Sequence, residues 1–148
     1  MPTAATRRVL PLAALLALVA AACHSTDLVS TTEPITGPGT VYALASANDI
    51  TLPATFTQEG ASFEIRKGAL TLGTDSRFIF SLALRSSVNG SIPANSTTTL
   101  RGAFTRDGAT ITLLQMGDTL FRGTYSPNSV TLLRQAAQIT GDRFAFVR

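Results

Sequence analysis

The 148-residue chain contains one cysteine, one histidine and no tryptophan, and only 14% of its residues are charged. A single cysteine excludes an internal disulfide framework, and a single histidine excludes a metal site built from several histidines. Because 45% of the residues are hydrophobic and both signs of charge are mixed, disorder along the whole chain is not expected. The length suits one domain of ordinary size.

The first 23 residues are typical of a secretory signal. Two arginines precede an apolar run over residues 9–22, which is shorter than the roughly 20 residues needed to span a bilayer. Three alanines then stand directly before Cys23. This arrangement resembles the lipobox of bacterial lipoproteins, in which the cysteine takes a diacylglycerol on its sulfur and becomes the new N-terminus. The resemblance implies a signal peptide over 1–22, a lipid on Cys23 and a place in the bacterial cell envelope, at the outer membrane or its periplasmic face.

An ordinary signal-peptidase site is the alternative interpretation of the same residues. Cleavage after Ala20-Ala-Ala22 would leave Cys23 as a free thiol at the mature terminus. We prefer the lipid anchor, because an unpaired thiol in an exported protein needs an explanation and acylation provides one. Several acyl chains on one residue would hold the protein firmly, since a single chain binds a membrane only marginally.

The formal net charge of +3 overstates the basic character of the expected mature protein. Without Arg7 and Arg8, ten basic residues remain against nine acidic ones, which leaves a charge of +1. So weak a charge provides no electrostatic basis for binding nucleic acid. Nucleic acid is therefore excluded as an expected partner.

Residues 23–39 are predicted to form a flexible tether, and residues 40–148 a folded domain. The tether is rich in Ser, Thr, Pro and Gly and follows no sustained period. His24 lies in it, so the domain has no histidine. In the domain, short alternating runs are separated by turn residues about every 8 to 12 positions, which is typical of an all-β protein.

The clearest alternation lies in RFIFSLALR, residues 77–85, where Phe78, Phe80 and Leu82 share one face. Turns are expected at Glu59-Gly60, Asp107-Gly108, Gly117-Asp118, Pro127-Asn128 and Gly141-Asp142. The longest and most polar loop is expected over Ser86–Ser96, as a mobile lid or partner surface. The expected strands are Val41–Ser46, Ile50–Phe56, Ser62–Arg66, Ala69–Leu72, Arg77–Arg85, Thr98–Thr105, Ala109–Gln115, Thr119–Tyr125, Ser129–Arg134 and Arg143–Val147.

A weak internal repeat links two of these strands. RGAF at 101–104 and RGTY at 122–125 lie 21 residues apart, and each precedes a turn and an apolar strand. Gly102 and Gly123 occupy equivalent places beside an aromatic residue, where we expect a bend in the strand.

The order of these segments resembles the small lipocalin-like, calycin-type domains of bacterial envelope proteins. The resemblance rests on TVYALASANDITLPATF, GALTLGTDSRFIFSL, the RGAF and RGTY strands and the terminal RFAFVR. It implies an up-and-down antiparallel meander closed into a barrel of about eight strands, with the first strand beside the last. It also implies a ligand-binding mouth, for which the candidate lining residues are Tyr42, Phe63, Phe80, Phe104, Phe121 and Tyr125.

Catalysis is not expected, and neither a cofactor nor a metal is implied. The domain has no histidine or cysteine, and its one lysine, Lys67, lacks the S-x-x-K spacing of a Ser–Lys pair. Most of its carboxylates fall at predicted turns, where aspartate commonly bonds to local backbone. An enzyme that needs two carboxylates across one cleft therefore finds no support.

Two kinds of non-catalytic function remain. The first is a binding domain for a small apolar ligand at the barrel mouth. The second is a protein-interaction module, such as an inhibitor of an envelope hydrolase or an assembly factor, which would use the Ser86–Ser96 loop and the outward arginines. A hollow interior favours the first and a filled interior the second. We expect a mostly packed interior, because seven rings point inward: Phe63, Phe78, Phe80, Phe104, Phe121, Phe144 and Phe146.

Overall fold

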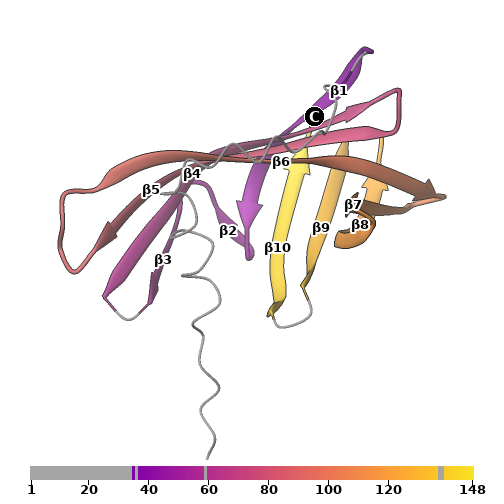
Figure 1. Cartoon of the computed structure of the whole chain (residues 1–148). Helices are drawn as coiled ribbons and strands as arrows, with labels where there is room; N and C mark the ends of the chain where they lie inside the picture. The colour runs from indigo at the N-terminus through magenta and orange to yellow at the C-terminus, as the bar shows by residue number, and fades with distance from the viewer. Residues whose placement is uncertain (1–34, 36, 59, 137–138) are drawn as a thin grey trace, which may run out of the picture. The chain divides into compact units, whose positions relative to one another are not determined.

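The computed structural model describes residues 35, 37–58, 60–136 and 139–148 (Figure 1). The expected signal peptide, Cys23, and Glu59 of one expected turn lie outside these residues. The described part of the chain contains no helix that is long and apolar enough to cross a membrane. Its strands are β1 (Gly39–Ala47), β2 (Ile50–Thr51), β3 (Ala54–Gln58), β4 (Ala61–Gly73), β5 (Arg77–Val88), β6 (Ala94–Asp107), β7 (Thr110–Gln115), β8 (Asp118–Ser126), β9 (Ser129–Ala136) and β10 (Ile139–Val147).

Eight of the strands close into an antiparallel barrel, as predicted. From β4 to β10 each strand pairs with the next one along the chain. Strand β1 closes the ring because its first half pairs with β4 and its second half with β10. Leu44 lies opposite Phe146, which confirms that the first and last strands are neighbours. The short strands β2 and β3 extend the sheet beyond the ring.

Three details of the expected strand pattern are wrong. The strands expected at 62–66 and 69–72 are one strand, β4, and the apparent break is a bulge between Ile65 and Lys67. The strand expected over 50–56 is two pieces, β2 and β3, separated by Leu52 and Pro53, because proline has no N–H for a ladder. Gly141 and Asp142 do not form a turn; they lie within β10, where the pairing with β9 shifts between Thr140 and Arg143.

The long loop expected over Ser86–Ser96 is also wrong. Strand β5 continues to Val88 and β6 begins at Ala94, so only residues 89–93 connect them. The connection is tied down, because the Asn89 N–H donates to the Gly60 carbonyl at 2.8 Å and the Val88 N–H donates to Ser91 Oγ at 3.0 Å. The strands lack alternation here because residues 94–97 are exposed whichever face they occupy. The polar composition of residues 86–96 is that of exposed strand ends and a short connection.

The core lies inside the barrel and follows the predicted alternation of β5. Phe78, Phe80 and Leu82 are buried, and they pack with Leu70 and Leu72 of the neighbouring β4. No polar or charged side chain is buried among the described residues. The interior therefore depends mainly on apolar packing.

The two glycines of the repeat lie where strands approach closely. A side chain on Gly102 would collide with the Leu114 carbonyl, and one on Gly123 would collide with the Thr131 carbonyl. The next residue, Ala103, is where the pairing of β6 with β5 ends and its pairing with β7 begins. Glycine is needed at positions 102 and 123 for a close backbone contact within the barrel.

Candidate functional site

The six predicted lining residues fall into separate groups. Tyr42, Phe80 and Phe121 are buried, whereas Phe104 and Tyr125 are half-buried and pack against the core. Phe63 is half-buried and stacks on Phe56 with ring centroids 5.7 Å apart. Phe63 lies on the same face as the buried Ile65, but it is not among the side chains that pack against the core, so it does not fill the interior as expected.

The centre of the barrel is filled by a cluster of four phenylalanines. The Phe80 ring lies 5.4 Å from Phe121, 5.4 Å from Phe144 and 5.6 Å from Phe146, measured between centroids. Phe121 and Phe144 are 6.0 Å apart. These are the separations and mostly edge-to-face angles that aromatic rings prefer. The expected packed interior is confirmed at this level of the barrel.

A second aromatic group involves the first half of β1. The hydroxyl of Tyr42 lies 3.5 Å from the Tyr125 hydroxyl and 3.5 Å from the Pro127 carbonyl oxygen. Burial, followed by the hydrogen bond with Tyr125, raises the pKa of Tyr42 from 10.0 to about 12. The Arg106 guanidinium stands 4.6 Å above the Tyr125 ring. Tyr42 is thus a neutral phenol at ordinary pH and has no anionic form to act as a base.

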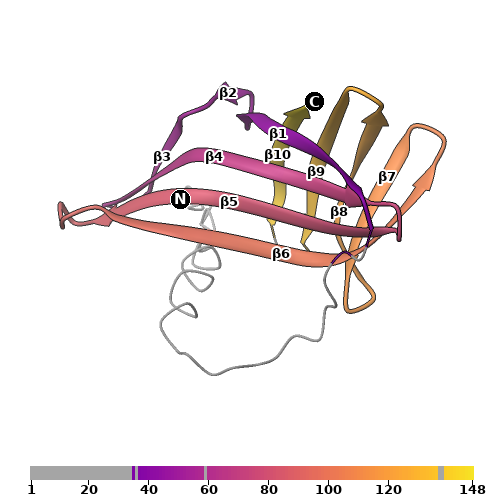
Figure 2. The same cartoon turned by 90° about the horizontal axis from the view of Figure 1, so that it is seen from above.

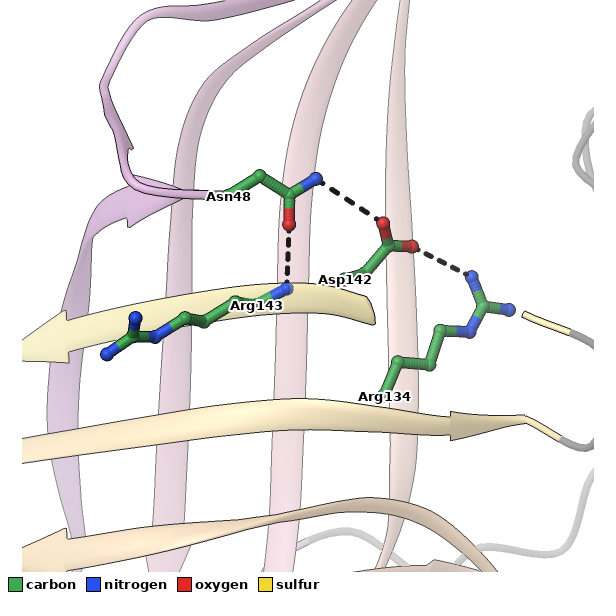
Figure 3. Close-up of polar contacts among 4 residues, drawn as sticks. All are labelled: Asn48, Arg134, Asp142 and Arg143. Atoms are coloured by element: carbon green, nitrogen blue, oxygen red, sulfur yellow. Dashed lines mark hydrogen bonds and ion pairs between the residues drawn. The ribbon is translucent and has the colours of Figure 1, made fainter. Parts of the chain in front are cut away.

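A polar junction, defined by Asn48, Arg134, Asp142 and Arg143, joins β1, β9 and β10 (Figure 3). The backbone N–H of Arg143 donates to Asn48 Oδ1 at 2.8 Å, and Asn48 Nδ2 donates to Asp142 Oδ1 at 3.4 Å. Arg134 Nη1 lies 3.6 Å from the other oxygen of Asp142. The backbone of Asn48 is in the left-handed region, with φ of 49°, and its side chain reaches β10. These contacts fasten the end of β1 to β9 and β10.

Sequence reasoning did not single out Asn48 or Arg134. They contact Asp142 across a separation in sequence that alternation does not bridge, since Asn48 and Asp142 are 94 residues apart. The sequence feature that could have drawn attention to Asn48 is the Asn48-Asp49 pair, because such pairs favour tight hairpin turns. In the structure both residues have positive φ and form the turn between β1 and β2.

Among the described residues, two surface hollows lie away from the phenylalanine cluster. The larger, of about 550 Å³, is beside the bulge of β4 and is lined by Arg66, Lys67, Ala83, Leu84, Asn95, Ser96 and Thr97. The smaller, of about 240 Å³, is lined by Thr55, Ser62, Glu64, Arg85, Ser86, Ser87 and Pro93. Neither includes an aromatic ring. Small-ligand pockets are typically lined by apolar and aromatic side chains, and these two are not.

Within the described ranges, no three His, Cys, Asp or Glu side chains stand close enough to hold a metal ion. Comparison with family models, curated proteins and solved structures found no match to the chain. The class of the protein therefore follows from its own architecture. It is a closed, eight-stranded antiparallel β-barrel with a ring-filled centre.

Proposed function

We propose that the protein is a lipid-anchored binding protein of the bacterial cell envelope, with a non-catalytic, lipocalin-like barrel that binds another protein. The packed centre of the barrel is the observation that favours a protein partner over an apolar small molecule. Phe80 is 2% exposed and touches three rings, so an apolar small molecule would have to displace core side chains to enter. A partner bound to the outside of the barrel needs no such displacement.

The projecting sheet offers a surface for that partner. We define it as β3 with Ala61–Ile65 of β4, Leu84–Val88 of β5 and residues 94–98 of β6, which extend past the rest of the barrel in Figure 1. Residues directly opposite in antiparallel strands share a face. One face thus carries the apolar Phe56, Phe63, Leu84 and Val88 together with Ser86 and Ser96, and the other carries polar side chains, among them Thr55, Glu64, Arg85 and Asn95.

A photo-crosslinking residue at Val88, which is 55% exposed on the projecting sheet, tests protein binding in living cells. We expect light-dependent adducts with another protein at Val88 and none at Thr124. Thr124 is a suitable control because it is exposed on β8, a strand paired on both sides. The purified protein should show no saturable binding of a fluorescent fatty acid. Saturable fatty-acid binding without adducts at Val88 would replace this proposal with a small-ligand carrier.

The anchor is tested by replacing Cys23 with Ser. We expect the variant to leave the membrane fraction, because no sulfur remains for the diacylglycerol and no other acyl chain holds the protein. Cell fractionation followed by immunoblotting measures the partition. Exchange of the neighbouring Ser25 for Ala serves as the control and should leave the protein membrane-bound. If the Cys23→Ser protein stays in the membrane fraction, the anchor is not a lipid on this cysteine.

A further inference from the structure

Strand β6 has an open edge along most of its length. It pairs with β5 from Ala94 to Ala103, but with β7 only from Ala103 to Asp107. Between Ala94 and Gly102, no strand of the described residues pairs with the edge of β6 that faces away from β5. Figure 2 shows β6 at the margin of the sheet. Gln115, the last residue of β7, donates from Nε2 to the Arg101 carbonyl at 3.2 Å. The edge is therefore free over residues 94–100.

This edge lacks the usual protections against strand addition. Residues 94–100 read ANSTTTL and include neither a charge nor a proline, and most of them are exposed. Natural edge strands are commonly blocked by charged residues, prolines or short length. Both free-edge strands follow directly on a proline, Pro53 before β3 and Pro93 before β6, but β3 is only five residues long whereas β6 has fourteen. The β6 edge is thus the better template for another strand.

The two most exposed large apolar side chains flank this edge at opposite ends. Ile92 is 93% exposed and lies just before β6, while Met116 is 87% exposed and follows Gln115 at the end of β7. When two copies of this edge pair in antiparallel fashion, the N-terminal end of one edge lies beside the C-terminal end of the other. Each Ile92 would then lie near the Met116 turn of the other copy.

We propose that the occupant of the β6 edge is the β6 edge of a second copy of this chain. Pairing of residues 96–100 with the same residues of the other copy centres the twofold axis on Thr98, and it ends before Arg101, whose carbonyl accepts from Gln115. In this register Thr97 lies opposite Thr99, and no like charges meet. Opposed residues keep the same face in both copies, and the barrels join into one continuous sheet. This interface goes beyond the proposed function, because it requires no other protein.

Disulfide cross-linking of the full-length, detergent-solubilised protein tests the register. Thr98→Cys is expected to give a covalent dimer under mild oxidation, because facing residues at the centre of the pair have Cβ atoms within disulfide reach. Thr124→Cys is the matched control, and the unaltered chain sets the background from Cys23. Cross-linking at Thr98 no stronger than at Thr124 would overturn the interface.

Charge provides an independent test that creates no covalent bond. Thr97→Lys combined with Thr99→Lys places lysines opposite one another across the axis, and we expect dimer association to weaken by about tenfold or more. Thr119→Lys with Thr124→Lys adds the same charge on β8 and should leave association unchanged. Sedimentation equilibrium measures the dimer, and circular dichroism checks that each variant is folded. A monomeric unaltered chain, or a dimer indifferent to the β6 lysines, contradicts the proposal even if adducts form at Val88.

Discussion

Deletion of the last six residues, 143–148, is expected to abolish the cooperative thermal unfolding of the domain. The deletion removes most of β10, which pairs with both β1 and β9. Phe144 and Phe146 leave the core with it, and the loss of a buried phenylalanine side chain typically costs about 3 to 5 kcal/mol. Two such losses are comparable with the whole stability of a typical domain, about 5 to 15 kcal/mol. The deletion also opens two new strand edges, which favours aggregation.

Removal of Arg148 alone is the matched control for this deletion. It shortens the chain but leaves the pairing of Val147 with Ser129, so the transition should remain within a few degrees of that of the full chain. Differential scanning calorimetry and circular dichroism measure both variants. A cooperative transition retained by the six-residue deletion would mean that the β1–β10 closure is dispensable.

Replacement of Phe80 by Ala is expected to reduce the free energy of unfolding by about 3 to 5 kcal/mol. Phe80 stands at the centre of the phenylalanine cluster, and its removal leaves Phe121, Phe144 and Phe146 without their common neighbour. A barrel cannot collapse readily onto the space, because its diameter is set by the number and register of its strands. Urea unfolding followed by circular dichroism measures the change.

Phe63→Ala provides the comparison for Phe80→Ala. The same atoms are removed, but Phe63 is half-buried on the projecting sheet and its ring contact is with Phe56. We expect a clearly smaller loss of stability at Phe63. If Phe80→Ala cost no more than Phe63→Ala, the centre would not be tightly packed, and an apolar ligand would have room to bind.

Alternation and turn residues in the sequence determined the fold class and the inward face of the strands. Phe78, Phe80 and Leu82 of β5 are buried as the period of two requires, because successive side chains of a strand point to opposite faces. The turns at Gly60, Gly108 and Gly117 could also be predicted, because glycine tolerates positive φ and is common in turns. In the structure each of these glycines has a positive φ. The order of the hairpins led to an antiparallel barrel closed by β1 and β10.

Only the tertiary structure decided how far the strands extend and which edges stay open. Residues 94–97 are exposed on either face, so no alternation distinguishes this part of β6 from a loop. The contact between Asn48 and Asp142, and the pairing of β1 with β4 as well as β10, join segments that local patterns do not connect. Alternation reports the face of a side chain, whereas closure of the barrel sets the neighbour of each strand. The free β6 edge follows from the strand pairing, because β7 reaches only from Ala103 to Asp107 of β6.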